Sequence, residues 1–443
     1  MIGPVGRLLE RWFPESRGEL TIGGVAATAL AEQYGTPLFV YDRGIIEAKW
    51  RMLRDALPPA FSIFYSMKAN PNRTVIGCLL EKGCGVEVAS GGELLHALDS
   101  GCPADRILFA GPGKSPAELE LALSRGIREI HVESVVEGRR IARIAQERGI
   151  RARVAVRVNP AGEAEGGAMR MGGRSAPFGV DEETLDGTVD EILALDGLEL
   201  SGIHLFTGTQ ILDADVLITQ YRKALDIARR VAVRLKHPLR TVDFGGGLGI
   251  PYFSHEADLD IGKLRELVAE LMESIRGDGV FAETEFIVEP GRYLVGESGV
   301  YLARITDIKV SRGKKFLILD GGMNHHLAAS GNLGQTIKRN YPIAIVNRLD
   351  SAAEEAVDIV GPLCTPLDTL GRAVTLPAAE IGDIVGVFQS GAYGRSASPL
   401  GFLSHPAPPE VWVRSGQHSL IREREALVGE HSRGEVFEAQ TGR

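Results

Sequence analysis

The sequence predicts an α/β fold, in which a closed (β/α)8 barrel is followed by a C-terminal β-rich domain. Three observations carry this prediction. Eight strand-like segments alternate with helix-like ones before Gly291. The first four strands recur about every 22 residues, which favours a closed barrel over an open, doubly wound sheet. After Gly291 the chain becomes strand-rich, with few helical runs.

Each of the eight predicted strands is a short run of apolar, β-branched and aromatic residues. In chain order they cover residues 61–67, 85–90, 106–111, 129–134, 152–158, 200–206, 241–246 and 285–290. Helical periodicity marks the stretches between them, most clearly at 93–101, 117–126, 136–149 and 264–277. Alternating strands and helices build a parallel sheet, and eight such units can close into a barrel.

The predicted domain boundaries follow this pattern. Residues 1–42 hold a short helix and a strand that joins the β domain, and residues 43–295 form the barrel. Residues 296–415 form the C-terminal β domain, and the charged segment 416–443 is a peripheral tail. A chain of 443 residues exceeds the usual size of one hydrophobic core, so two domains are expected.

Composition excludes several classes of protein. The chain is 44% hydrophobic and 24% charged, and its net charge of −9 argues against a nucleic-acid binder. No apolar run approaches the roughly 20 residues that cross a bilayer, and Arg7, Glu10 and Arg11 interrupt any signal-peptide core. The four cysteines show neither metal-ligand spacing nor a disulfide framework. We expect a cytoplasmic protein with no metal, nucleic acid or membrane as a partner.

Lys68 ends the first predicted barrel strand, in the run FSIFYSMKANPN. A lysine at the carboxyl end of a buried strand loses solvation, which lowers its pKa and makes the neutral amine available. Such an amine can form a Schiff base with an aldehyde cofactor. From this residue alone, a lysine that extends to the surface remains the alternative.

Polar, charged and glycine residues also follow the other strands, and all strand ends of a barrel meet at one rim. The glycines of FGGGLG (244–249) expose backbone N–H groups to which an anion can come close. Barrels often bind phosphate between the loops after strands seven and eight, and Gly291 and Arg292 lie in the second of these. Taken alone, the triple glycine is also compatible with a flexible turn.

Glu289 follows the eighth strand and completes the predicted set. A carboxylate that faces a pyridine nitrogen keeps the nitrogen protonated, so the ring can accept an electron pair from a substrate α-carbon. A cofactor joined to Lys68 and anchored at its phosphate needs such a group. The alternative is a buried ion pair between Glu289 and Arg292.

With these residues in place, the chain resembles the fold-type III pyridoxal-phosphate decarboxylases, which include the diaminopimelate, ornithine and arginine decarboxylases. The matching motifs, in chain order, are YSMKANPN, GVEVASGGEL, FAGPGK, HLFTGTQ, VDFGGGLG, VEPGRY, LDGGMN, GPLCTPLD and SGAYG. The resemblance implies an alanine racemase-like TIM barrel and a carboxy-lyase that depends on pyridoxal 5'-phosphate and removes the α-carboxylate of its substrate.

The resemblance also implies roles for individual residues. Lys68 and Cys364 are the catalytic pair, as the Schiff-base lysine and the acid that returns a proton to the α-carbon. The implied cofactor-binding residues are Lys68, Glu87, Arg157, Phe206, Thr209, Gly246, Gly247, Glu289, Gly291, Arg292 and Tyr393. In this family the cysteine enters the site from another subunit, which implies a head-to-tail homodimer with shared active sites.

Three departures from the family pattern concern the face of the cofactor and the substrate. Phe206 stands where a histidine commonly stacks on the cofactor, and Thr365 stands where an acid grips a distal ammonium. Without that acid, the charge-assisted contact that selects a distal cation is lost. The segment MNHHLAASG also lacks the arginine that diaminopimelate enzymes carry after GMN.

The motifs MRMGG-x4-FG, FTGTQ, IPYFSHE, DGGMNHH, RNYPI and GPLCTPLDTLG are similar to those of a narrower group, which acts on a glutamyl group held as a thioester on an acyl-carrier protein. The glycine-rich loop 161–173 is predicted to be a mobile flap. The candidate substrate-binding residues are Arg170, Arg174, Thr365 and Asp368. Solvated loop arginines remain the alternative for the first two.

Two other activities remain open from the sequence. A diaminopimelate decarboxylase of lysine biosynthesis is the principal alternative, which Thr365 opposes without excluding. A pyridoxal-phosphate-dependent amino-acid racemase is the further one. Racemases of this fold use a tyrosine acid and usually an arginine at the pyridine nitrogen, so Glu289 and Cys364 argue against it.

Overall fold

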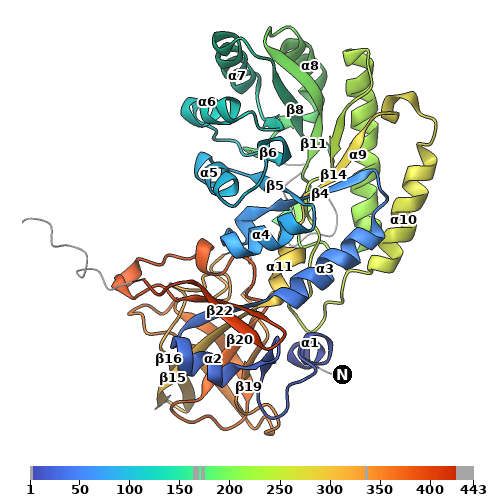
Figure 1. The fold of residues 1–443 in the computed structure, drawn as a ribbon. Helices are drawn as coiled ribbons and strands as arrows, with labels where there is room; N and C mark the ends of the chain where they lie inside the picture. The colour runs from blue at the N-terminus through green and yellow to red at the C-terminus, as the bar shows by residue number, and fades with distance from the viewer. Residues whose placement is uncertain (1–2, 163–168, 171–174, 334, 336–337, 426–443) are drawn as a thin grey trace, which may run out of the picture. The chain divides into compact units, whose positions relative to one another are not determined.

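The computed structural model describes residues 3–162, 169–170, 175–333, 335 and 338–425. The chain divides into two compact units (Figure 1). One unit consists of residues 43–299. The other combines the N-terminal residues 1–42 with residues 300–443. Within the described ranges, no helix has the length and apolarity that crossing a membrane requires.

Residues 43–299 form an eight-stranded parallel barrel, which confirms the predicted architecture. The barrel strands in order are β4 (Phe61–Ser66), β5 (Gly85–Val88), β6 (Ile107–Phe109), β7 (Glu129–Val132), β8 (Ala152–Asn159), β11 (Leu198–Leu205), β13 (Thr241–Asp243) and β14 (Glu285–Val288). Strand β14 pairs with β4 and closes the barrel. Phe64, Leu108 and Ile287 pack in one buried cluster.

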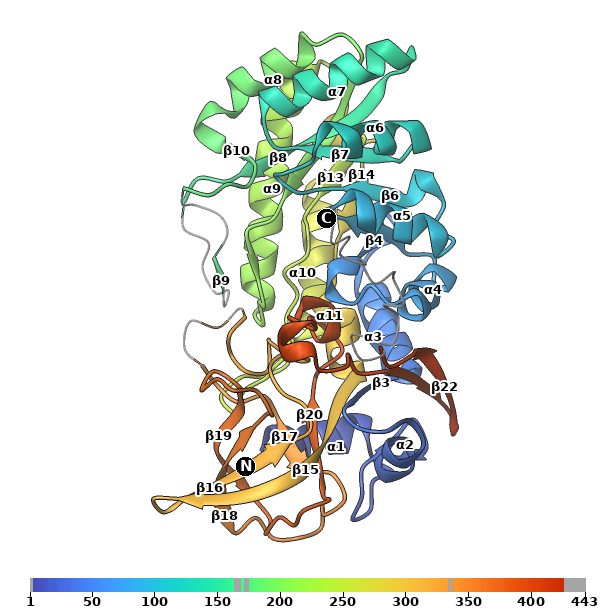
Figure 2. The same ribbon diagram turned by 90° about the vertical axis from the view of Figure 1, so that its left-hand side faces the viewer.

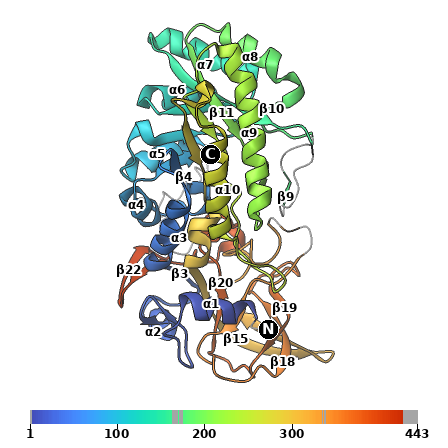
Figure 3. The same cartoon turned by 90° about the vertical axis from the view of Figure 1, so that its right-hand side faces the viewer.

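The helices of this unit alternate with the strands along the chain and lie outside them (Figures 1 and 2). They are α3 (Arg43–Ala56), α4 (Arg73–Glu81), α5 (Gly91–Asp99), α6 (Pro116–Arg125), α7 (Val135–Arg148), α8 (Leu185–Leu193), α9 (Ala214–Leu235), α10 (Ile261–Ser274) and α11 (Arg292–Val295). Helices α9 and α10 lie side by side (Figure 3). Three short strands complete the unit, β9 (Met169–Arg170), β10 (Val180–Asp181) and β12 (Gly208–Thr209).

Local sequence fixes where these helices begin and end. Ser115 accepts a hydrogen bond from the Glu118 backbone N–H, and Glu118 caps the Ser115 N–H in return, which starts α6. Ser134 caps α7 in the same position. Gly126 and Gly149 end α6 and α7 in the left-handed conformation, which glycine adopts without strain.

The other unit is built on a nine-stranded mixed sheet. Its strands are β3 (Leu38–Asp42), β15 (Gly299–Ser311), β16 (Lys314–Leu319), β17 (Ile343–Ile345), β18 (Glu355–Val360), β19 (Thr369–Leu376), β20 (Ile384–Phe388), β21 (Glu410–Arg414) and β22 (Gln417–Arg422). Helices α1 (Pro4–Trp12) and α2 (Ala27–Tyr34) and the hairpin of β1 (Thr21–Ile22) and β2 (Val25–Ala26) precede β3.

Residues 417–422, which the sequence placed in a peripheral tail, form the edge strand β22 of this sheet. It pairs antiparallel with β21, and Arg422 Nε donates to Glu410 Oε2 at 2.5 Å. An edge strand faces solvent on one side, so its charged side chains are compatible with sheet pairing.

His326 is a buried neutral imidazole in this unit. Its Nδ1 accepts a hydrogen bond from the Ala329 N–H at 3.3 Å, so its Nε2 carries the hydrogen that faces Ser390 Oγ at 2.9 Å. Ser390 Oγ in turn donates to the Val387 carbonyl oxygen at 2.7 Å. Burial lowers the pKa of His326 to about 3.

We expect His326 to make the protein acid-labile. An unfolded histidine binds a proton below about pH 6.5, whereas folded His326 stays neutral, so the unfolded state binds more protons and stability falls as pH falls. Between pH 7 and pH 5 the wild type should lose about 2 kcal/mol more unfolding free energy than His326→Asn loses. Urea denaturation at the two pH values measures this. An equal loss in both proteins would contradict the assignment.

Candidate active site

Lys68 lies on the short turn Met67–Ala69 that follows β4. Its Nζ is 3.5 Å from Glu87 Oε2, and its side chain is 48% exposed, whereas that of Glu87 is 2% exposed. Ser66 Oγ donates to the same Glu87 oxygen at 2.5 Å. The desolvation expected at a buried strand end is not found, because β4 ends at Ser66 and the turn carries Lys68 beyond it. The Lys68 side chain is therefore partly exposed beside one buried carboxylate.

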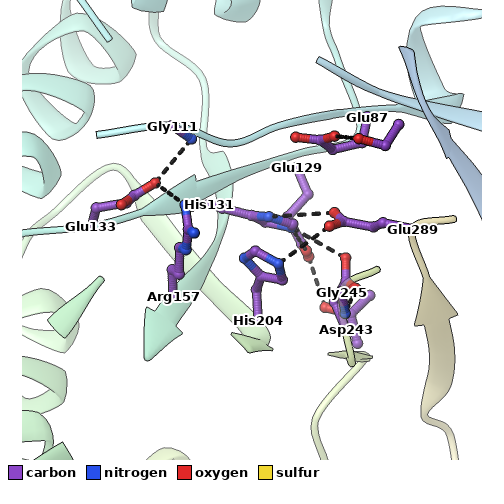
Figure 4. A network of polar contacts seen from close by, with 12 residues as sticks. Glu87, Gly111, Glu129, His131, Glu133, Arg157, His204, Asp243, Gly245 and Glu289 are labelled. Carbon is purple, nitrogen blue, oxygen red and sulfur yellow. Dashed lines mark hydrogen bonds and ion pairs between the residues drawn. The ribbon is translucent and has the colours of Figure 1, made fainter. Parts of the chain in front are cut away.

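A fully buried group of four ionisable side chains lies at strand ends of the same barrel (Figure 4). The group consists of His131, His204, Asp243 and Glu289. One ring nitrogen or carboxylate oxygen of each residue lies within 4.8 Å of those of the other three. Glu289 Oε2 is 3.3 Å from His204 Nε2, and Glu289 Oε1 is 4.0 Å from His131 Nδ1. The two imidazoles stack with ring centroids 4.3 Å apart. Glu129 lies behind His131, with Oε1 3.5 Å from its Nε2.

Protons are distributed unequally within this group. Burial lowers the pKa of His204 to about 4, so its imidazole is neutral at pH 7. Burial and the nearby Glu289 raise the pKa of Asp243 well above its usual range. Burial alone would also raise the pKa of Glu289, but His204 and His131 hold it below its usual range. The ionised carboxylate of the group is therefore Glu289.

Of this group, only Glu289 was predicted from the sequence; His131, His204 and Asp243 were not. The sequence does contain polar residues at alternate positions, and alternate residues of a strand share one face. Glu129, His131 and Glu133 occupy alternate positions of one segment, and His204 stands two residues before Phe206. Imidazole and carboxylate groups also bind metal ions. Because His204 Nε2 and Glu289 Oε2 lie 3.3 Å apart and the two groups differ in protonation, we assign the group to proton placement.

The loop after β13 holds three glycines, 245–247, and passes close to neighbouring backbone. A Cβ atom at Gly246 would lie 2.6 Å from the carbonyl oxygen of Glu289. Gly247 has a φ of +96°, and its Cβ would lie 3.1 Å from the carbonyl oxygen of Gly208. Only glycine fits at these positions. The loop therefore lacks side chains that would keep an anion from its N–H groups.

The loops after β14 and β4 pack on each other beside Lys68. The Ser66 N–H donates to the Pro290 carbonyl oxygen at 3.3 Å. A Cβ at Gly291 would lie 3.2 Å from the Ser66 carbonyl oxygen. Pro290 and Gly291 directly follow Glu289, on which the glycine loop packs. Lys68, Glu289 and the glycine loop 245–247 are thus neighbours along one stretch of the barrel rim.

Three further predicted cofactor residues surround this stretch. Arg292 Nη1 donates to Tyr252 Oη at 2.8 Å, and its guanidinium lies 5.5 Å from the centre of that ring. Phe206 is half-buried at the end of β11, with a ring carbon 3.8 Å from where a Cβ of Gly246 would be. Thr209 is half-buried in β12. All three belong to the barrel unit.

Arg157 is held by a buried carboxylate. Its Nη1 is 2.8 Å from Glu133 Oε1, and its guanidinium lies 5.1 Å from the Phe178 ring centre. Glu133 also accepts hydrogen bonds from the N–H groups of Gly111 (Figure 4) and Gly179, each at 2.9 Å. Burial opposes its ionisation, but Arg157 and these hydrogen bonds lower the pKa of Glu133. Arg157 and Glu133 form an ion pair that ties the ends of β7 and β8.

Comparison with known proteins identifies this barrel. Residues 43–296 match the family described as pyridoxal-dependent decarboxylase, pyridoxal binding domain. The chain belongs to the pyridoxal-dependent decarboxylases. The L-glutamyl-[BtrI acyl-carrier protein] decarboxylase of Niallia circulans is 43% identical over 400 residues, which cover 90% of this chain and 93% of that protein. The diaminopimelate decarboxylase of Methanothermobacter thermautotrophicus is 36% identical over 94% of this chain and 96% of its own length.

Solved structures agree with the family. A diaminopimelate decarboxylase from M. jannaschii is 29% identical and has a TM-score of 0.85, covering 93% of this chain and 94% of that one. This decarboxylase is thus a fold-type III enzyme, a carboxy-lyase that uses pyridoxal phosphate, as the sequence predicted. The rim of the barrel fits that cofactor. The partly exposed Lys68 amine, the buried and ionised Glu289 carboxylate and the glycine loop 245–247 are neighbours there.

Four further predicted residues of the decarboxylase, Cys364, Thr365, Asp368 and Tyr393, lie in the other unit. Cys364 is exposed on the loop between β18 and β19, and Thr365 N donates to the Leu363 carbonyl oxygen at 2.8 Å. Asp368 is 2% exposed, and its carboxylate accepts the N–H groups of Met323 at 2.6 Å and Leu363 at 2.9 Å. Asp368 is a predicted substrate-binding residue. In the structure, its carboxylate accepts two backbone hydrogen bonds, one of them from the loop that carries Cys364.

Tyr393 is half-buried in the same unit and has a φ of +53°. In the barrel unit, Arg170 belongs to β9, whose backbone pairs antiparallel with β12 at Thr209. Arg174 and most of the predicted flap 161–173 lie outside the described residues.

Proposed function

We propose that this decarboxylase acts on a glutamyl-type group held as a thioester on an acyl-carrier protein. The observation that carries the proposal is Thr365, next to Cys364, where a carboxylate would be needed to bind a distal ammonium. A glutamyl group has no such ammonium. The relative from Niallia circulans, 43% identical over 90% of this chain, is named for a glutamyl-carrier substrate.

The residues of the rim would divide the chemistry among them. Bound pyridoxal phosphate supplies an electron sink for the pair left on the α-carbon when carbon dioxide departs. Lys68 would hold the cofactor through Nζ, beside the Glu87 carboxylate. Glu289 would keep a proton on the ring nitrogen, because its pKa lies below its usual range and the carboxylate is ionised. Phe206 would cover one face of the ring.

The phosphate would be bound by backbone N–H groups and one guanidinium. Glycines without side chains let a phosphate reach the loops after β13 and β14. The residues proposed for this role are Thr209, Gly246, Gly247, Gly291, Arg292 and Tyr393.

We further propose that Cys364 Sγ donates the proton that replaces the lost carboxylate, and that it does so in the site of a second subunit. Cys364 is exposed, as a group that reaches another chain must be. The proposal therefore includes a head-to-tail homodimer with shared sites.

A parallel assay tests the substrate assignment. Carbon dioxide release should be measured with glutamyl-carrier protein and with free glutamate, diaminopimelate, ornithine and lysine. We expect kcat/KM for the carrier-bound substrate to exceed each of the others by about 100-fold, because binding energy from the arm is lost in free amino acids. Comparable turnover of free diaminopimelate would overturn the assignment. Loss of optical activity without carbon dioxide release would indicate a racemase instead.

A further inference from the structure

A basic cavity of about 300 Å³ lies in the unit of residues 1–42 and 300–443. Three cations line it, Lys338, Arg339 and Arg372. Polar side chains that can hydrogen-bond add to the lining, Ser330, Asn340 and Thr369. Among its described lining residues there is no carboxylate. The cavity therefore favours an anion.

Hydrogen bonds hold the two walls of this basic cavity together. Asn340 Nδ2 donates to the Arg372 carbonyl oxygen at 2.7 Å, and the Arg372 N–H donates to Asn340 Oδ1 at 2.9 Å. Lys338 Nζ donates to Asn332 Oδ1. A Cβ at Gly331 would lie 3.0 Å from Lys338 Cγ, so the segment closes tightly on itself. The cations are thus carried by segments that side-chain hydrogen bonds tie together, which reduces the entropy lost when an anion binds.

The basic cavity adjoins the loop that carries Cys364. Asn332 Nδ2 donates to the Leu367 carbonyl oxygen at 3.2 Å, and the Thr369 N–H donates to the same oxygen at 2.9 Å. Thr369 itself lines the cavity and is five residues from Cys364. Five extended residues span at most about 18 Å. A long substrate with its reacting end at Cys364 can therefore place a distant group in the cavity.

We propose that the basic cavity binds the phosphate diester of the arm that carries the acyl substrate. This inference rests on the carrier-bound substrate proposed above. Guanidinium groups bind phosphate oxygens through two parallel hydrogen bonds, and an ammonium adds a point charge. A carrier protein presents this phosphate as a diester, and coenzyme A presents it within a diphosphate, so either source can offer phosphate oxygens to the cavity. A free amino acid has no phosphate to offer.

Three thioesters test the proposal: glutamyl-pantetheine, which lacks the phosphate, glutamyl-coenzyme A and glutamyl-carrier protein. In Arg372→Gln and Lys338→Gln we expect KM for the two phosphate-bearing substrates to rise about 10-fold with kcat unchanged, because a charge-assisted hydrogen bond contributes about 1.5 kcal/mol. KM for glutamyl-pantetheine should not change. If KM rises only for glutamyl-carrier protein, the cations contact the protein and not the phosphate, and the proposal is overturned.

Two exposed positions outside the cavity lining provide matched controls. Lys309→Gln and Arg414→Gln remove the same charges from strands β15 and β21 and should leave all three KM values unchanged. Equal KM increases in these controls would assign the effect to overall charge and sink the inference.

Direct binding separates this inference from the substrate proposal. If wild-type enzyme releases no carbon dioxide from any glutamyl thioester, the proposed function fails. Calorimetry with 4'-phosphopantetheine and pantetheine then tests the basic cavity alone. Tighter binding of the phosphorylated compound that Arg372→Gln weakens about 10-fold supports the cavity as a phosphate site. Equal affinities for the two compounds would refute it.

Discussion

Lys68→Ala is expected to lower kcat/KM for decarboxylation on the order of 10⁴-fold and to abolish the absorbance of lysine-bound cofactor. Another lysine cannot readily substitute at this rim. Lys114 is 4% exposed, and its Nζ donates to the carbonyl oxygens of Gly111 and His131 and pairs with Glu137 at 2.9 Å. Absorbance spectra and carbon dioxide release measure both effects.

The control for this change is Lys82→Ala, at the C-terminal end of α4, which should retain the absorbance and the activity. A Lys68→Ala enzyme that keeps both would show that a different amine holds the cofactor.

Mixing Lys68→Ala with Cys364→Ala tests the shared sites. About a quarter of wild-type activity should return, because half of the dimers are mixed and each of those has one intact site. No recovery would mean that each subunit uses its own cysteine.

Glu289→Gln is expected to reduce kcat/KM by about 10²- to 10³-fold while the cofactor stays bound. A neutral amide cannot keep the ring nitrogen protonated, whereas Lys68 and the glycine loop are untouched. Asp243 is not expected to replace the lost charge, because burial is the main cause of its raised pKa and persists without Glu289. Steady-state kinetics and the cofactor absorbance separate catalysis from binding.

Glu289→Asp is the matched control, since it keeps the negative charge on a shorter side chain. It should retain more activity than Glu289→Gln at every pH. Should the two variants be equally impaired, the position of the oxygen atoms would matter and the charge would not.

The local pattern of the chain determined the barrel and much of its rim. Strand and helix periodicity located all eight barrel strands. Lys68, Glu289 and the glycine loop stood out because each directly follows a strand, and the strand ends of a barrel converge. The exposure of Lys68 was not predictable in this way. It depends on β4 ending two residues before the lysine, which is decided by pairing with β5 and β14.

The buried acid–base group was decided only by the tertiary structure. His131, His204, Asp243 and Glu289 lie on or next to four different barrel strands, β7, β11, β13 and β14, and no short motif joins them. A lone histidine in an apolar strand carries no signal of its partners. Closure of the barrel brings these side chains together and removes water from around them, and that desolvation sets which of them is charged.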